Sequence, residues 1–347
     1  MAKLKDKPGH SAVAIAPMMD WTDRHCRYFL RLLNRDVHLY TEMLTAAALV
    51  HGDGQRLLRF HPAEHPVALQ LGGSDPAMMA AAAREGAKAG YDEININVGC
   101  PSDRVQSGQF GACLMANPGR VAECVRAMRA ATDVPVTIKT RIGIDDKLDQ
   151  KDSYDFLRQF VETVADAGCT TFIVHARKAI LEGLSPKDNR QVPPLNYERV
   201  YRLKREHPEL AIVLNGGVTT TAQVLHHLEH VDGVMIGRQA YQDPWFLVQL
   251  GHAIGGGRRT AASRRAVVEE MLPYVEQELA AGAELKHITR HMLGLFKGQP
   301  GARAWRRHLS ENAHRPGAGI EVIDRALARL PSTEVTAPAL YKTQACR

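Results

Sequence analysis

The strongest constraint on the fold is an alternation of strand-like and helix-like segments that repeats through the first 245 residues. Short β-branched apolar runs are followed by a polar or glycine-marked turn, and then by a stretch with helical spacing of apolar residues. Eight such runs are Ala12–Met18, Val37–Met43, Val67–Gly72, Glu93–Val98, Val136–Ile142, Thr171–Ala176, Ala211–Leu214 and Gly233–Ile236. Alternating strands and helices imply a parallel sheet. Eight strands over about 240 residues, without the G-x-G-x-x-G turn of a dinucleotide-binding sheet, predict an α/β fold of the (β/α)8 TIM barrel type.

Helices are expected between the strands, and several carry start signals. The expected helices include Asp75–Ala89, Pro118–Ala131, Ser153–Ala167 and Thr221–Glu229. Ser74-Asp75-Pro76, Asn117-Pro118 and the Thr219–Thr221 run each place a capping residue or an N1 proline ahead of a helix. We therefore expect these helices to begin close to those residues.

A second group of helices is expected after the barrel. Leu285, Ile288, Met292 and Leu295 fall at helical spacing, and Gly255-Gly256-Gly257 is a plausible linker. The sequence thus predicts a catalytic barrel over residues 1–250, a small C-terminal all-α helical bundle over residues 251–330, and a disordered tail over residues 331–347.

The basic residues are concentrated in the last quarter of the chain. The net charge of +6 comes from 44 Lys and Arg against 38 Asp and Glu, yet residues 1–250 contain 29 of each kind. Residues 251–330 contain 13 basic against 8 acidic residues, and residues 285–310 contain no acid. Such a run is either a solvated helical face or an electrostatic surface for a polyanion such as nucleic acid.

Polar residues and glycines recur where the predicted strands end, which is where barrel enzymes place their chemistry. The strand ends carry two methionines, Met18 and Met19, and then Glu42, Gln70, Asn95, Asn97, Cys100, Lys139, Arg141, His175, Arg177, Asn215-Gly216-Gly217 and Gly237-Arg238. The last two groups follow strands seven and eight, where barrels usually bind phosphate. Glycines there let backbone N–H groups approach an anion, and the Arg238 guanidinium adds a positive charge with paired N–H donors. The alternative is that these glycines serve only tight packing.

Three side chains at these ends could carry chemistry. Cys100 lies between Gly99 and Pro101, where a thiol could act as a nucleophile, a metal ligand or, while protonated, a proton donor. The Lys139 amine could form a Schiff base with a carbonyl substrate. Alternatively, its ammonium group could pair with an anionic ring or a phosphate. His175 could be a hydrogen-bonded core histidine, but its place at a strand end beside Arg177 favours contact with a ligand. Of the other cysteines, Cys124 and Cys169 are expected to be buried, and the place of Cys113 is ambiguous.

Other classes of protein are disfavoured. No apolar run approaches the roughly 18 residues of a membrane span, and the N-terminal lysines precede only a short apolar stretch. The six cysteines form no C-x-x-C pair, so neither a disulfide framework nor a structural metal is indicated. We expect a cytoplasmic protein without a metal.

Taken together, several motifs resemble those of the tRNA-dihydrouridine synthases. They are the segment from Ala16 to Asp23, Gln70-Leu71-Gly72-Gly73, Asn95-Ile96-Asn97-Val98-Gly99-Cys100-Pro101-Ser102, Val174-His175-Ala176-Arg177, Asn215-Gly216-Gly217 and Ile236-Gly237-Arg238. The segments 108–115 and 185–190 resemble the bacterial A-type subgroup. The resemblance covers residues 13–310.

The resemblance implies a flavoenzyme that uses FMN and NADPH to reduce the C5–C6 bond of uridines 20 and 20a in the tRNA D-loop. It implies that hydride reaches C6 while Cys100 protonates C5, and that Asn97 holds the uracil edge. The residues implied to bind FMN are Pro17, Met18, Met19, Gln70, Lys139, His175, Asn215, Gly216, Gly217, Gly237 and Arg238. The residues implied to contact tRNA are Lys187, Arg190, Arg303 and Arg306, and the protein is expected to act as a monomer.

Three rival functions remain at this point. An FMN barrel that acts on a free pyrimidine, of the dihydroorotate dehydrogenase type, shares the barrel and phosphate loops but gives no reason for a basic helical appendage. A Schiff-base aldolase would use Lys139. A non-catalytic RNA-binding protein, built on a barrel that has lost its catalytic function, would bind tRNA without a flavin.

Overall fold

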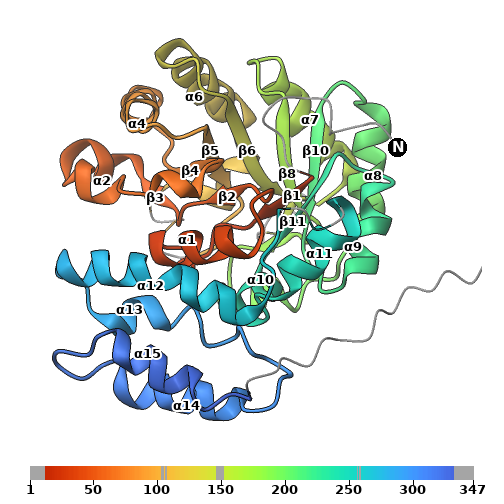
Figure 1. The fold of residues 1–347 in the computed structure, drawn as a ribbon. Coiled ribbons are helices and arrows are strands. Elements are labelled where there is room, and N and C mark those ends of the chain that lie inside the picture. The colour runs from red at the N-terminus through yellow and green to blue at the C-terminus, as the bar shows by residue number, and fades with distance from the viewer. Residues whose placement is uncertain are drawn as a thin grey trace, which may run out of the picture.

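The structure is a computed structural model, and it describes residues 12–102, 105, 108–145, 152–255, 257 and 259–331. Within these residues eight parallel strands form a barrel, in the order β1-β11-β10-β8-β6-β5-β4-β2 (Figure 1). They are β1 (Val13–Ile15), β2 (Leu39–Tyr40), β4 (Val67–Gly72), β5 (Glu93–Val98), β6 (Val136–Arg141), β8 (Thr171–His175), β10 (Ala211–Asn215) and β11 (Gly233–Ile236). A parallel bridge between Ala14 and His38 joins β1 to the segment that leads into β2 and closes the ring. The predicted TIM barrel is confirmed.

Helices follow the strands and cover the outside of the barrel (Figure 1). They are α1 (Arg24–Leu33), α4 (Pro76–Lys88), α6 (Pro118–Ala131), α7 (Tyr154–Ala165), α8 (Tyr197–Glu206), α9 (Thr221–Leu228), α10 (Arg238–Gln242) and α11 (Phe246–Gly255). The predicted starts are confirmed at α4, α6 and α9, where the side chains of Asp75, Asn117 and Thr220 cap the first turn.

Smaller elements occupy the loops between the strands and helices. They are β3 (Leu44–Thr45), α2 (Ala46–His51), α3 (Gly54–Leu57), β7 (Ile144–Asp145), β9 (Ala179–Ile180), and the 3-10 helices η1 (Pro62–Glu64), η2 (Gly111–Ala116) and η3 (Asp188–Arg190). β3 pairs with β4, and β7 pairs with β9. These elements lengthen the loops from which the site is built.

Two strands are shorter than the sequence predicted. β1 ends at Ile15 although the apolar run continues to Met18, because the Met18 carbonyl accepts hydrogen bonds from the backbone of Trp21 and Thr22 and so begins a turn. β2 ends at Tyr40 although the run continues to Met43. The apolar residues beyond both strands belong to the rim of the barrel.

Strand alternation divides the barrel interior into an apolar side and a polar side. The inward residues of β1, β8, β10 and β11 include Ala14, Ile173, Val213 and Met235, which pack together. Apart from Ala68, which joins the apolar cluster, β4, β5 and β6 turn mainly polar side chains inward, and all of these except the half-buried Lys139 are buried: Gln70, Glu93, Asn95, Asn97, Thr137, Lys139 and Arg141. Because an inward polar group must find a partner in the barrel, this side is the natural place for a site.

The remaining helices lie beside α1 at the lower edge of the view in Figure 1. They are α12 (Arg264–Ala280), α13 (Leu285–Thr289), α14 (Ala302–Asn312) and α15 (Ile320–Leu327). Trp305 of α14 is fully buried, with its ring centroid 5.0 Å from that of Phe296. The boundary expected at residue 250 falls inside α11. Apart from Pro331, the expected tail lies outside the described residues.

The helix expected through Leu295 is only partly present. α13 ends at Thr289, and the chain continues in tight turns that still bury Met292 and Leu295. The Met292 N–H donates to the Thr289 carbonyl at 3.0 Å and the Leu295 N–H to that of Met292 at 3.1 Å. Turns of three residues also place every third side chain on one face, so the apolar spacing could not distinguish them from an α-helix.

Polar contacts, some of them partly exposed, join these helices to α1 and to the segment that contains Arg59. The Glu278 carboxylate of α12 accepts hydrogen bonds from Arg24 at 2.8 Å and from Arg59 at 2.6 Å. His25 Nδ1 lies 2.8 Å from the Tyr274 hydroxyl. Asp23, the N-cap of α1, pairs with Arg290. α1 follows β1 directly, so these contacts fix the helices relative to the rim of the barrel.

In the described part of the chain we find no helix long and apolar enough to span a bilayer.

Candidate functional site

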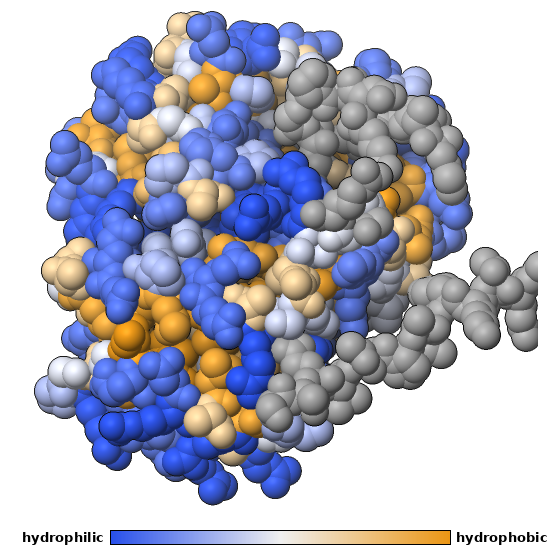
Figure 2. Space-filling model, viewed as in Figure 1, coloured by the Kyte–Doolittle hydropathy of each residue, from blue (hydrophilic) through white to orange (hydrophobic). Residues whose placement is uncertain are grey.

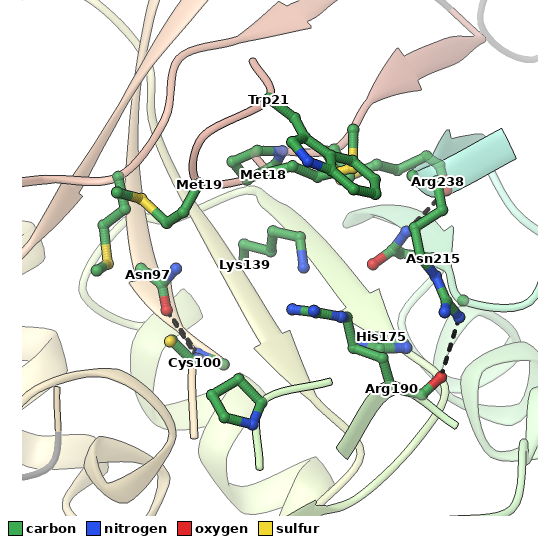
Figure 3. Close-up of a pocket in the computed structure, with 18 of the residues that line it drawn as sticks. Met18, Met19, Trp21, Asn97, Cys100, Lys139, His175, Arg190, Asn215 and Arg238 are labelled. Carbon is green, nitrogen blue, oxygen red and sulfur yellow. Dashed lines mark hydrogen bonds between the residues drawn. The ribbon is translucent and has the colours of Figure 1, made fainter. Parts of the chain in front are cut away.

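A pocket of about 570 Å³ opens at the carboxyl ends of the barrel strands. It brings together most of the residues that the sequence singled out, from segments as far apart as β1 and α10 (Figure 3). The predicted residues that line it are Pro17, Met18, Met19, Gln70, Asn97, Cys100, Lys139, His175, Arg190, Asn215, Gly216, Gly217, Gly237 and Arg238. The geometry therefore gathers all the residues expected at the cofactor and at the reacting base into one cavity.

The loop after β10 presents backbone rather than side chains to the pocket. Gly216 and Gly217 have φ of +116° and +70°, in the left-handed region that favours glycine. A Cβ at Gly216 would lie 2.6 Å from the ring of His175, and one at Gly217 would lie 2.5 Å from Leu195. Neither position can accept a side chain without movement, so these glycines serve tight packing against His175 and Leu195. Both also line the pocket with their backbone, which can bind a phosphate through N–H groups.

The pocket is strongly positive. Lys139, Arg141, Arg190 and Arg238 line it beside His175, and the only acidic residue among the described lining is Asp20 at the rim. Burial, reinforced by the neighbouring Arg141, lowers the pKa of Lys139 to about 7. Burial and Arg141 also hold the pKa of His175 well below its ordinary value. A bound anion would relieve this repulsion, so the pocket favours a negatively charged ligand.

The loop that carries Cys100 is fixed by its backbone. The Asn97 side-chain oxygen accepts hydrogen bonds from the backbone N–H of Gly99 at 3.1 Å and of Cys100 at 2.9 Å (Figure 3). The Cys100 carbonyl accepts from the N–H of Ala112 at 2.9 Å, and the Cys100 thiol lies 3.4 Å from the Ser102 hydroxyl. The hydrogen bonds therefore fix the backbone of Cys100, and its side chain lines the pocket.

Arg141 connects the loops after β5 and β8. Its buried guanidinium donates to the carbonyls of Gly99 at 2.9 Å, Asn189 at 3.0 Å and Lys178 at 3.1 Å. The sequence placed Arg141 at a strand end but gave it no role. Its structural contribution is to hold two walls of the pocket together.

The other cysteines lie away from the cavity. Cys124 and Cys169 are buried, as predicted, and Cys26 is buried as well. The Cys113 thiol, on η2, donates to the Phe110 carbonyl at 3.1 Å and does not line the pocket. Among the cysteines of the described residues, Cys100 is thus the one whose thiol reaches the cavity. Cys346 lies outside that part of the chain.

Trp21 is a lining residue to which the sequence analysis gave no role. Its ring stacks on Tyr241, with centroids 4.4 Å apart and an angle of 11°. The Tyr241 hydroxyl lies 3.2 Å from His291 Nδ1, and His291 Nε2 lies 3.0 Å from the Asp23 carboxylate. This network ties the rim at Trp21 to the segment after α13. The contacts span more than 200 residues of sequence, so no local signal could have shown them.

The residues expected to contact tRNA are divided between two places. Arg190, on η3, lies at the pocket, where its carbonyl is 3.4 Å from the Arg238 guanidinium. Lys187 is exposed just before η3. Arg303 and Arg306 are exposed on α14, whose buried face is formed by Ala302, Trp305 and Leu309. Hydrophilic residues line the lower edge of the molecule in Figure 2, where Figure 1 places α14 and α15.

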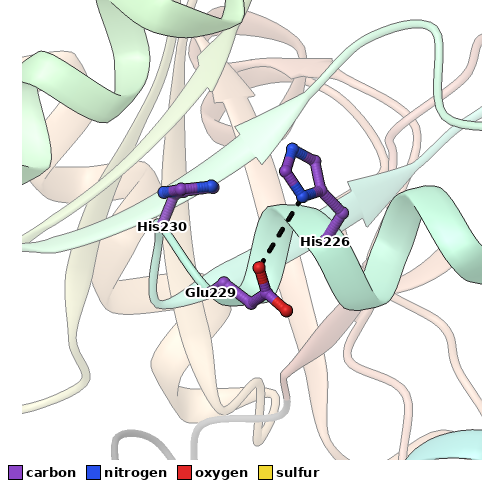
Figure 4. Close-up of side chains that lie close together, drawn as sticks. All are labelled: His226, Glu229 and His230. Carbon is purple, nitrogen blue, oxygen red and sulfur yellow. Dashed lines mark ion pairs between the residues drawn. The ribbon is translucent and has the colours of Figure 1, made fainter. Parts of the chain in front are cut away.

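A small cluster of potential metal ligands lies at the end of α9, among residues that do not line the pocket. His226, Glu229 and His230 offer ligand atoms within 4.8 Å of one another (Figure 4). All three side chains are exposed, and His226 already pairs with Glu229 at 3.7 Å. We assign no function to this cluster.

Comparison with known proteins identifies the family. The family described as "Dihydrouridine synthase (Dus)" matches residues 14–330. The chain belongs to the dihydrouridine synthase family. The match includes the helices after the barrel as well as the barrel itself.

Relatives share most of their length with this dihydrouridine synthase. It is 58% identical to the tRNA-dihydrouridine(20/20a) synthase of Vibrio cholerae over an alignment of 324 residues. The alignment covers 93% of this chain and 98% of the relative. It is 59% identical to the proteins of the same name from Shewanella oneidensis, covering 90% of this chain and 92% of the relative, and from Escherichia coli strain K12, covering 90% of both. The resemblance found in the sequence motifs is confirmed.

Proposed function

We propose that this dihydrouridine synthase reduces the C5–C6 bond of uridines 20 and 20a in the D-loop of tRNA, with bound FMN and with NADPH as the reductant. The observation that carries the proposal is the position of the Cys100 thiol in a positively charged pocket beside a glycine cradle. The names of the relatives support the substrate and its positions.

The pocket suits FMN because it combines a phosphate cradle with flat apolar and polar walls. Gly216, Gly217, Gly237 and Arg238 would hold the phosphate. Pro17, Met18 and Met19 would lie against the ring system, and Gln70, Lys139, His175 and Asn215 would contact its polar parts. When bound, FMN supplies the hydride that uracil C6 receives, and NADPH replaces those two electrons. The described neighbours of the Lys139 ammonium provide no carboxylate, so a reduced, anionic ring would be its counter-ion.

Cys100 completes the reduction. As C6 gains hydride, the Cys100 thiol gives its proton to C5, so the C5–C6 double bond becomes a single bond. The thiolate that remains takes a proton from water. Asn97 would orient the uracil edge, since its side chain lines the same wall as Cys100. A uridine reaches this cavity only when it leaves the stacked tRNA structure, as in other enzymes that act on a base.

The helices after the barrel would position the tRNA. The exposed Arg303 and Arg306 of α14, together with Lys187 and Arg190 near the pocket, would contact phosphates. The proposal divides the chain into a catalytic barrel over residues 1–250 and a tRNA-binding part over residues 251–330. It describes a cytoplasmic monomer whose reaction requires no metal.

The purified protein tests this proposal directly. It should be yellow, release FMN on denaturation, and oxidise NADPH faster when unmodified tRNA is present. A yellow protein that reduces free pyrimidines and ignores tRNA would instead indicate the dihydroorotate dehydrogenase type of reaction. A colourless protein that is trapped on Lys139 by borohydride with its substrate would indicate an aldolase, and a colourless protein that only binds tRNA would indicate a non-catalytic role.

A further inference from the structure

A chain of hydrogen bonds runs through the polar side of the barrel interior toward the Cys100 loop. It begins at Glu93, an inward residue of β5 that does not line the pocket and whose side chain is 9% exposed. Asn95 and Asn97 follow on the same face of the strand, while Ile94 and Ile96 point to the surrounding helices. The reaction described above gives no reason for a buried carboxylate below the pocket.

The hydroxyl groups around Glu93 define the direction of the chain. Oε1 of Glu93 accepts hydrogen bonds from the Tyr40 hydroxyl at 2.7 Å and from the Thr137 hydroxyl at 2.6 Å. A carboxylate accepts and does not donate, so the single proton of each hydroxyl points to Glu93. The Thr137 oxygen is then left as an acceptor, and Asn95 Nδ2 donates to it at 2.7 Å.

Each following amide has its orientation set by the link before it. Because the Asn95 amide nitrogen faces Thr137, its oxygen faces Gln70 and accepts from Gln70 Nε2 at 2.8 Å. The Gln70 oxygen in turn accepts from Asn97 Nδ2 at 2.9 Å. The two ends of an amide are nearly equal in size, so packing alone would not choose between its orientations.

The last link reaches the loop of the proton donor. With its nitrogen committed to Gln70, Asn97 turns its oxygen to the backbone N–H groups of Gly99 and Cys100. If the chain were reversed, the Asn97 amide nitrogen would face those two donors, and buried donors would meet without an acceptor. The direction of the whole chain is therefore coupled to the position of the Cys100 backbone.

We propose that Glu93 is a positioning residue for Cys100 and acts through the directional chain of Thr137, Asn95, Gln70 and Asn97. The proposal rests on the proposed function, in which Cys100 protonates uracil C5. The Glu93 carboxylate, as a fixed acceptor at one end of the chain of hydrogen bonds, thus keeps the Cys100 thiol at the other end in the geometry needed for proton transfer.

Thr137 provides the sharpest test because its hydroxyl is the link between the carboxylate and the amides. Thr137→Val keeps the shape and removes the hydroxyl, whereas Thr137→Ser keeps the hydroxyl. Tyr40→Phe is the matched control, since it removes the other buried hydrogen bond to the same Glu93 oxygen and leaves the chain intact. All are measured in the full-length protein loaded with FMN, with the flavin reduced first and tRNA added second.

We expect Thr137→Val to slow uridine reduction by about tenfold or more, because proton transfer depends steeply on geometry. Flavin content and the rate of flavin reduction by NADPH should stay unchanged. Thr137→Ser and Tyr40→Phe should remain within about threefold of the wild type. In ligand-free protein, the rate of Cys100 alkylation by iodoacetamide should change in Thr137→Val and not in Tyr40→Phe.

The proposal is overturned if Thr137→Val and Tyr40→Phe behave alike in both measurements, or if Thr137→Ser does not restore the rate. It is also overturned if Thr137→Val merely lowers the folded, flavin-loaded fraction, which the melting temperature and flavin content report. A wild-type protein that forms no dihydrouridine would contradict the proposed function instead, and the alkylation comparison would still test the chain of hydrogen bonds.

Discussion

The positive charge of the barrel pocket and that of the outer face of α14 differ in their surroundings. In the pocket, Lys139, Arg141 and His175 are at least partly buried, and burial, followed by repulsion from neighbouring arginines, lowers the pKa values of all three. On α14, Arg303 and Arg306 are exposed to solvent. Buried charge interacts strongly with one ligand in a fixed place, whereas exposed charge acts over a longer range and is screened by salt. We therefore assign chemistry to the first region and tRNA placement to the second.

The largest expected effect belongs to the pocket. Cys100→Ala should slow dihydrouridine formation by about 10²–10⁴-fold, because it removes the general acid. FMN content and flavin reduction by NADPH should be retained, since the thiol donates its proton only to the base. Cys113→Ala is the matched control and should keep its activity. Substantial dihydrouridine from Cys100→Ala in a single-turnover assay would refute the role of this thiol.

The next effect concerns the junction between the two regions. Glu278→Ala leaves Arg24 and Arg59 without their partner, and the side chain of Glu278 is only 5% exposed. Because both arginines are partly exposed, we expect a loss of about 2 kcal/mol in the free energy of unfolding, below the range for a fully buried pair. Chemical denaturation measures it, and Glu276→Ala, at an exposed position on the same helix, is the control. Equal stability of the two variants would show that this junction is not held by Glu278.

Lys139 gives the pocket a distinctive dependence on pH. Its pKa is about 7 in the ligand-free protein, and the anionic ring of reduced FMN, which we place beside it, must raise that pKa. Binding of reduced FMN then takes up a proton above pH 7, so the affinity for reduced FMN should be greatest below pH 7 and should fall by up to about tenfold per pH unit as the pH rises. Lys139→Met should bind FMN more weakly and lose this dependence, whereas Lys88→Met, on the surface of α4, should match the wild type. An anaerobic titration with reduced FMN, followed by flavin absorbance, measures this affinity, and identical pH profiles for wild type and Lys139→Met would count against the role of Lys139.

The smallest effect is expected on α14. Arg303→Ala and Arg306→Ala should each weaken tRNA binding by about threefold at low salt and reduce the dependence of affinity on salt concentration. Flavin content should not change. Arg84→Ala, an exposed arginine on α4, is the control. If filter binding shows the same affinity and salt slope for the α14 variants and the control, this face does not contact tRNA.

The sequence predicted the barrel and the content of its pocket because both depend on local periodicity. Once eight parallel strands are assumed, their carboxyl ends must meet at one face, and residues as distant as Gln70 and Arg238 come together. The strand limits near Met18 and Met43 were missed because the apolar run continues into the rim. Periodicity reports burial, and residues of the rim such as Met18 and Met43 are half-buried as well.

The contacts between distant segments could not be read in the same way. Trp21 meets Tyr241 of α10 because β1 and β11 are neighbours in the barrel, and Glu278 meets Arg24 and Arg59 because α12 packs on α1. The alternation of Glu93, Asn95 and Asn97 with isoleucines was visible in the sequence and indicates an inward polar face. Its link to Thr137 depends on the register of β5 and β6, which pairs Asn95 with Thr137 and which the sequence does not specify.

The most direct test of the central claim is to map dihydrouridine in tRNA. Unmodified tRNA transcripts are incubated with the full-length protein, FMN and NADPH, and the modified positions are located by mass spectrometry of nuclease fragments. We expect dihydrouridine at positions 20 and 20a with the wild type, and at most a trace with Cys100→Ala over the same reaction time. Unmodified tRNA after complete turnover of NADPH, with reduction of a free pyrimidine in its place, would contradict it.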